Sequence, residues 1–193
     1  MTAMPSVGPE PFERLYRRHA DPWGYLSSPY ERAKYRHTLQ VLPRPRYRAG
    51  LEVGCSIGVL GGLLAGRCRD LLGIDFSAVA LAQARRRHAG RDGLRFQQCR
   101  VPGDFPAGRF DLIVLSEILY FLDRQDLRRL ATKVGTALLP GGDLVLVSWL
   151  GATDTPLNGD AATDCFLRAA APPFTVKRRA RRKGYRLDLL TRR

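Results

Sequence analysis

Every second position from 52 to 58 carries an acid or a small residue, namely Glu52, Gly54, Ser56 and Gly58. Asp75 follows them at a sequence separation that suits a shared ligand site. An apolar run leads into these residues, and a second apolar run ends at Asp75. In an open parallel sheet, glycine lets the backbone approach a ligand closely. An acid at the end of the next strand accepts hydrogen bonds from a ribose diol. The spacing therefore predicts a site that holds a nucleoside by its ribose.

The glycine spacing indicates which nucleoside is expected. A nicotinamide-binding turn has the order G-x-G-x-x-G, and a P-loop requires Gly-Lys-Ser/Thr; neither occurs at this turn. The segment Glu52-x-Gly54-x-Ser56-x-Gly58 resembles the first motif of class I S-adenosylmethionine (SAM) methyltransferases, with Ser56 in place of the middle glycine. The resemblance implies SAM as cofactor and assigns its binding to Glu52, Gly54, Cys55, Ser56, Gly58 and Asp75. A purely structural turn is the alternative.

Apolar and amphipathic segments alternate as in the class I methyltransferase sheet. They predict one α/β domain, Rossmann-like, with a mostly parallel sheet, helices on both faces and an antiparallel C-terminal hairpin. We expect the single domain to span residues 1–193, with a helical lid in 1–45 and the SAM-binding core in 46–193. The expected strands are 49–53, 71–75, 94–97, 110–116, 143–149, 174–179 and 185–190. Helices are expected at 11–18, 29–42 and 161–169. A further helix should turn Leu60, Leu63 and Leu64 inward, and another should begin after its cap Ser77 and end at Arg87. The last should run from Asp123 to Leu138 and be ended by Pro140-Gly-Gly142.

Ligands of such sheets bind beyond the carboxyl ends of the strands. This places Phe76, Arg100, Val101 and Ser116 among the expected cofactor-binding residues. Phe76 is expected either to pack against adenine or to join the core. Many methyltransferases carry an acid after the third strand, whereas this chain has Gln98-Cys-Arg-Val101. Backbone groups near Arg100 and Val101, or a glutamine side chain, are therefore expected to meet the adenine.

The segment Ser116-Glu-Ile-Leu-Tyr120 is expected beside the methyl group that is transferred. Nucleobase amino-methyltransferases usually carry Asn/Asp-Pro-Pro-aromatic there, and its absence argues against a DNA or RNA base as acceptor. Glu117 instead provides a carboxylate that would attract a protonated amine and accept its proton. Glu117 and Tyr120 are therefore candidate catalytic residues. The alternative for Glu117 is a structural role, capping the turn or binding backbone amides.

The N-terminal segment concentrates aromatic residues at Trp23, Tyr25, Tyr30 and Tyr35. Because no expected strand lies near enough in sequence to bury all four, we expect them to form a lid over the methionine half of the cofactor. Arg32 and Lys34 are expected to reach the cofactor carboxylate or a substrate. A lid that excludes water would favour methyl transfer.

A narrower resemblance covers residues 12–190. Asp21-Pro-Trp23, Ser28-Pro-Tyr-Glu-Arg32, Phe110-Asp-Leu-Ile-Val-Leu-Ser-Glu117 and Leu157-Asn-Gly-Asp160 are similar to segments of the nodulation protein S family. That family comprises SAM-dependent N-methyltransferases of de-N-acetylated chito-oligosaccharides. The resemblance implies that Trp23, Tyr30 and Arg32 line the cofactor and substrate cleft and that Asp160 lies near the acceptor, as a third catalytic candidate.

This chain differs from the family where a histidine is expected shortly after Gly159-Asp160. The sequence there is Ala161-Ala-Thr-Asp164. Either Glu117 acts alone on the acceptor or the acceptor is a different one. The expected partner is therefore a small-molecule or oligosaccharide amine, and the sequence gives no oligomeric state.

Composition limits the other classes of function. Among 193 residues, 45% are hydrophobic, but the longest apolar runs are strand-sized, so no membrane span is expected. The N-terminus has no secretory pattern and the four cysteines have no metal-site or disulfide spacing, which together predict a metal-free cytoplasmic protein.

The net charge of +14 comes almost entirely from arginine, with clusters at 85–87 and 177–183. Aromatic residues are not interleaved with these clusters, so a nucleic-acid partner is not expected. The alternatives that stay open are an O-methyltransferase of a small natural product and a basic RNA-associated protein without enzymatic activity. Steep salt dependence of binding would identify the latter.

Overall fold

A seven-stranded sheet with the strand order β3-β2-β1-β4-β5-β7-β6 organises the chain. It is seen in a computed structural model that describes residues 4–170 and 173–193. Strands β1 to β5 run parallel, and β7 pairs antiparallel with both β5 and β6. The strands are β1 (Tyr47–Val53), β2 (Cys68–Asp75), β3 (Leu94–Gln98), β4 (Phe110–Ser116), β5 (Leu138–Trp149), β6 (Phe174–Arg182) and β7 (Tyr185–Arg192). The predicted mixed sheet with its C-terminal hairpin is confirmed.

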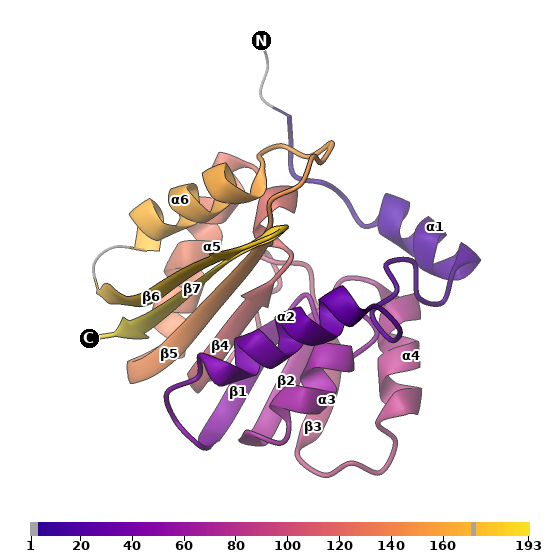
Figure 1. Cartoon of the computed structure of the whole chain (residues 1–193), viewed down its shortest axis with the longest axis horizontal. Coiled ribbons are helices and arrows are strands. Elements are labelled where there is room, and N and C mark those ends of the chain that lie inside the picture. Colours follow the sequence, from indigo (N-terminus) through magenta and orange to yellow (C-terminus); the bar gives the residue numbers. More distant parts are fainter. Residues whose placement is uncertain (1–3, 171–172) are drawn as a thin grey trace.

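Helices cover both faces of the sheet (Figure 1). They are α1 (Glu10–Arg18), α2 (Pro29–Gln40), α3 (Val59–Leu64), α4 (Ala78–Arg87), the 3₁₀ turn η1 (Leu119–Phe121), α5 (Arg124–Ala137) and α6 (Gly159–Ala170). Helices α2, α3 and α4 lie on one side, and α5 and α6 lie on the other (Figure 1). Ser28, Ser77 and Asp123 cap the starts of α2, α4 and α5 through side-chain oxygens that accept backbone N–H groups.

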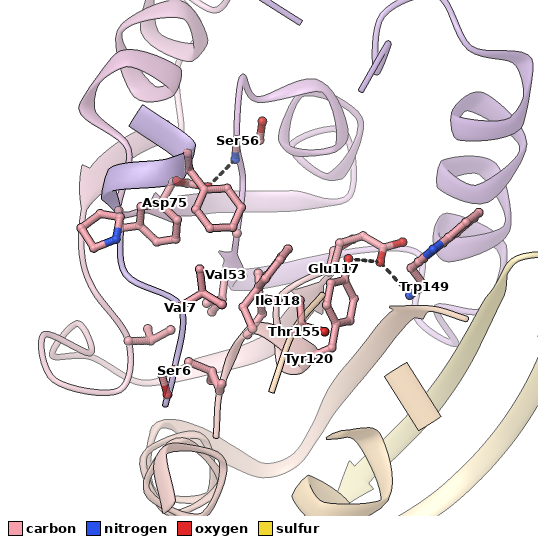
Figure 2. A pocket seen from close by; sticks show the side chains of 18 of the residues that line it. Ser6, Val7, Val53, Ser56, Asp75, Glu117, Ile118, Tyr120, Trp149 and Thr155 are labelled. Atoms are coloured by element: carbon pink, nitrogen blue, oxygen red, sulfur yellow. Dashed lines mark hydrogen bonds between the residues drawn. The ribbon is translucent and has the colours of Figure 1, made fainter. Parts of the chain in front are cut away.

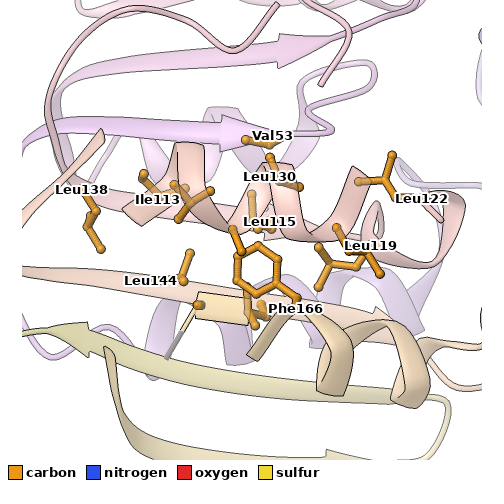
Figure 3. Close-up of a cluster of buried hydrophobic side chains, with 14 of the residues drawn as sticks. Val53, Ile113, Leu115, Leu119, Leu122, Leu130, Leu138, Leu144 and Phe166 are labelled. Carbon is orange, nitrogen blue, oxygen red and sulfur yellow. The ribbon is translucent and has the colours of Figure 1, made fainter. Parts of the chain in front are cut away.

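The central strand β4 is buried along its whole length, as expected for a parallel strand covered on both faces. Ile113 and Leu115 of β4 meet Leu130 of α5 and Phe166 of α6 in the larger core cluster (Figure 3). The second cluster lies between the sheet and helices α2 and α3. A rigid sheet packed on both sides fixes the carboxyl ends of β1, β2, β4 and β5, where the site lies.

Three details differ from the expectation. Leu63 is 46% exposed, because α3 is a six-residue helix whose inward face is formed by Leu60 and Leu64. Helix α5 ends at Ala137, and Leu138 already pairs with Phe110 as the first residue of β5. The Pro140-Gly-Gly142 segment therefore lies inside β5, at a register shift where Gly141 adopts φ +73°.

Helix α2 also lies differently from the expected lid. It packs over the sheet, and Tyr35 is 6% exposed in the second core cluster. The prediction that Tyr35 belongs to a lid over the cofactor is therefore wrong. In the described residues, no helix combines the length and apolar character needed to cross a membrane.

Candidate cofactor and acceptor site

A cavity of about 1120 Å³ opens at the carboxyl ends of β1, β2, β4 and β5. Its lining runs from Asp75 and Ser56 at one end to Glu117 and Trp149 at the other (Figure 2). The segment before α1 crosses one side of it, where the Val7 N–H donates to Phe121 O at 2.8 Å and Ser6 Oγ donates to Asp126 at 2.7 Å. One cavity thus joins Ser56 and Asp75, predicted to bind the cofactor, to Glu117 and Tyr120, predicted to act on the acceptor.

The turn after β1 has a conformation that explains its small residues. Gly54, Ser56 and Gly58 have φ values of +81°, +49° and +79°, in the left-handed region that favours glycine. A Cβ on Gly54 would lie 2.1 Å from Ile118 Cγ2, and one on Gly58 would lie 2.9 Å from Ala84 Cβ. Gly54 thus permits the close approach of the Ile118 side chain beside the cavity, and Gly58 permits close packing against α4. Ser56 has a side chain, so its positive φ costs conformational free energy that a glycine would not pay. Its hydroxyl hydrogen-bonds to the Tyr16 hydroxyl.

Asp75 closes this turn. Its carboxylate accepts the N–H groups of Ser56 and Ser77, each at 2.9 Å. Burial raises the pKa of Asp75 to about 6, against the lowering effect of these two amide bonds. Each carboxylate oxygen keeps a further lone pair that can accept a ribose hydroxyl.

An aromatic wall adjoins Asp75. Phe76 lines the cavity and packs edge-to-face on Phe12 of α1, with ring centroids 5.0 Å apart. Arg100, Val101 and Ser116 also line the cavity, as predicted for residues at strand ends. Gln98 does not: its amide donates to Phe76 O at 2.9 Å.

Glu52 and Cys55 lie behind the turn and not on the large cavity. They border a separate hollow of about 20 Å³, enough for one water molecule. Burial, followed by the charge of Asp75, raises the pKa of Glu52 to about 8. Glu52 Oε2 has no hydrogen-bond partner among the described residues and faces Gly61, where an added Cβ would lie 2.6 Å away.

Glu117 stands at the opposite end of the cavity in a conformation that few residues other than glycine adopt, with φ +59°. Its Oε2 accepts the Trp149 N–H at 2.8 Å and the Tyr120 hydroxyl at 2.9 Å (Figure 2). Its Oε1 accepts Lys34 Nζ at 2.6 Å. Three donors from three segments therefore fix this carboxylate, and one of its roughly four lone-pair positions is left.

Lys34 connects Glu117 to a second carboxylate. Its Nζ also lies 2.9 Å from Glu31 Oε1 and 5.3 Å from the ring centroid of Tyr30. The side chains of Lys34, Glu31 and Glu117 are 3%, 10% and 15% exposed. We call Glu31, Lys34 and Glu117 the charged triad. In the sequence, the only signal for Glu31 is its i, i+3 spacing from Lys34.

The family model described as "Nodulation protein S (NodS)" matches residues 12–151. The chain belongs to the nodulation protein S family. A nodulation protein S of Rhizobium tropici is 33% identical over 130 residues, which are 66% of this chain and 55% of that protein. This chain thus spans about half the length of that curated relative.

Solved structures share the fold. A crystal structure of a protein from Pseudomonas syringae is 39% identical, with a TM-score of 0.74, and the match covers 84% of this chain and 99% of that one. N-methyltransferase NodS from Bradyrhizobium japonicum WM9, in complex with S-adenosyl-L-homocysteine (SAH), is 24% identical, with a TM-score of 0.80 and coverage of 95% and 97%. The predicted class I methyltransferase fold is therefore confirmed.

The residues singled out by the family resemblance take different positions. Trp23 and Tyr30 line the cavity; Trp23 is 41% exposed and stacks on Tyr25, and Tyr30 packs edge-to-face on Trp149. Arg32 points to solvent, with its guanidinium on Ser27 O at 2.8 Å. Lys34 is thus the basic residue of α2 that reaches the cavity.

Asp160 does not line the cavity. Its carboxylate pairs with Arg181 at 2.6 Å and with Arg186 at 3.4 Å, and these hydrogen bonds and charges lower its pKa. The hairpin arginines hold it at the start of α6, whereas Thr153, Asp154 and Thr155 of the preceding loop border the cavity. The structure therefore does not bring Asp160 together with Glu117 and Tyr120.

No three His, Cys, Asp or Glu side chains in the described ranges 4–170 and 173–193 lie close enough together to hold a metal ion.

Proposed function

We propose that this chain is a SAM-dependent methyltransferase that N-methylates a free amine, on an amino sugar or a de-N-acetylated chito-oligosaccharide. The observation that carries the proposal is that a single cavity joins the Asp75 turn to the Glu117 carboxylate. Family membership and the name of the B. japonicum relative, an N-methyltransferase in complex with SAH, support it.

The Asp75 end suits the adenosine half of SAM. The two free lone pairs of Asp75 would accept the ribose hydroxyls, and the methionine half would pass along the cavity wall at Gly54. Phe76 and Val101 provide apolar surface for the adenine face. When bound, SAM supplies an activated methyl group on a positively charged sulfur.

The Glu117 end suits an amine. The lone-pair position left on Glu117 Oε1 can accept an N–H of the acceptor and so orient its nitrogen toward the methyl group. Tyr120 and the Trp149 amide hold the carboxylate still during this step. Positioning of this kind supplies a large part of the rate of a two-substrate reaction. The Trp149 indole and the hydroxyls of Thr153 and Thr155 on the adjoining cavity wall provide stacking and hydrogen-bonding groups for a sugar.

The first experiment is calorimetric titration with SAH, followed by methyl transfer to chitosan oligomers. Saturable SAH binding and methylation of the free-amine oligomer, with no methylation of the fully N-acetylated oligomer of equal length, would support the proposal. Methylation of both oligomers would move the acceptor atom from nitrogen to oxygen. An absence of SAH binding by the folded protein would overturn the cofactor assignment.

A further inference from the structure

The charged triad contains two carboxylates and one ammonium group, so it carries a net charge of −1 at one end of the cavity. Its three side chains are at most 15% exposed, so their charges are weakly screened by solvent. Removing Lys34 would leave a charge of −2, and removing the charge of Glu31 would leave zero. The triad therefore sets the electrostatic field at the end of the cavity where the acceptor is proposed to bind.

N-methylation of a neutral amine conserves one positive charge in the reacting pair. The nitrogen lone pair forms the new N–C bond while the C–S bond breaks and its electron pair stays on sulfur. The positive charge thus moves from sulfur to nitrogen, and the excess proton leaves the product for water. A protonated amine has no lone pair to attack with, and it would raise the charge of the pair to +2.

We propose that Lys34 is a positioning residue that holds the net charge of the triad at −1. This charge matches the single positive charge of SAM together with a neutral amine. It therefore disfavours binding of the acceptor as the unreactive ammonium. This inference rests on the proposed function. Lys34 acts through Glu117, whose Oε1 it holds at 2.6 Å, and Glu31 holds Lys34 in turn. The ring of Tyr30 covers the ammonium at 5.3 Å and helps to keep it in place.

The test is the ratio of the Kd values for SAH and SAM, measured by calorimetry at one pH and one ionic strength. SAM and SAH differ by the methyl group and its positive charge, so the ratio reports the field at the sulfur and does not need an acceptor. Lys34→Met is expected to raise the ratio of Kd(SAH) to Kd(SAM) roughly fivefold to tenfold, the size expected for one charge at partly screened range. Glu31→Gln is expected to lower the ratio by a similar factor.

Two controls isolate the charge. Lys34→Arg keeps the charge and is expected to leave the ratio within about twofold of the wild-type value. Lys177→Met makes the same substitution at an exposed lysine of β6 that does not line the cavity, and it is also expected to leave the ratio unchanged. If Lys34→Met does not fold, a lowered ratio in Glu31→Gln beside an unchanged ratio in Lys34→Arg still decides the question.

The outcomes separate the two proposals. In the first outcome, the wild-type protein binds both compounds, and Lys34→Met and Glu31→Gln leave the ratio unchanged or shift it in the same direction. This outcome overturns the role of Lys34 and leaves the proposed function standing. Wild-type protein that binds neither compound overturns the proposed function, and this inference with it.

Discussion

The two ends of the cavity are built in different ways. The Asp75 end consists of a turn and a strand end within 54–77, and its geometry comes from backbone conformation and two amide hydrogen bonds. The Glu117 end is assembled from α2, the turn after β4 and the last residue of β5. The first end is a local motif, whereas the second exists only after the sheet has brought distant segments together. Substitutions at the two ends should therefore have different effects.

The largest effect is expected at the local end, from Gly54→Ala. The added methyl would lie 2.1 Å from Ile118 Cγ2 at a backbone φ of +81°, so both the turn and its neighbour would have to shift. We expect a loss of about 2–4 kcal/mol in the free energy of unfolding and a loss of SAH binding. Urea denaturation and calorimetry measure the two quantities. Ala33→Gly, an equally small substitution at an exposed position of α2, is the control. Normal SAH affinity in Gly54→Ala would contradict the geometry of the turn.

At the assembled end, Glu117→Gln is expected to reduce turnover of an amine acceptor about 100-fold while SAH affinity stays within about threefold of the wild-type value. The amide keeps the size of the side chain but loses the charge that Lys34 pairs with. Steady-state kinetics with saturating SAM, together with SAH titration, separate the two effects. Full turnover would show that Glu117 is only a structural part of the turn.

Asp75→Asn is expected to weaken SAH binding by about 1.5–3 kcal/mol, because hydrogen bonds from the ribose to a charged acceptor are lost. Turnover at saturating SAM should change less than in Glu117→Gln. An unchanged Kd in the folded variant would remove Asp75 from the ribose assignment.

The pH dependence of SAH binding gives a second test of Asp75. Burial raises its pKa from 3.8 to about 6, so the carboxylate form that ribose hydroxyls require is lost as the pH falls through about 6. In the free protein, a raised carboxyl pKa has the opposite consequence: its contribution to stability is present below about pH 4 and is lost as the pH rises through about 6. We therefore expect SAH affinity to be constant above pH 7 and to fall between pH 6 and 5, and this fall should be absent in Asp75→Asn.

The smallest effect is expected for Asp160→Asn, which lies at neither end. Its ion pairs with Arg181 and Arg186 are partly exposed and screened by solvent, so they contribute little to stability. Turnover and SAH affinity should match those of the wild type, and a thermal melt should shift by a few degrees at most. A large loss of turnover with normal SAH binding would return Asp160 to the acceptor site.

The sequence by itself determined the local end of the cavity and the succession of strands along the chain. The left-handed turn needs small residues at 54, 56 and 58, and the sequence has glycine or serine at each of them. The acid at the end of β2 is likewise visible in the sequence. Apolar runs such as 112–115 of β4 mark the parallel strands, because strands that are buried on both faces are mostly apolar.

Only the tertiary structure decided which charged residues meet. Lys34 and Glu117 are 83 positions apart, and they touch because α2 packs on the sheet beside the end of β4. The same long-range packing buries Tyr35 in the core and pairs the Asp160 carboxylate with arginines of the β6–β7 hairpin. Residue types and spacing record local backbone requirements, whereas ion pairs between distant segments depend on how those segments pack.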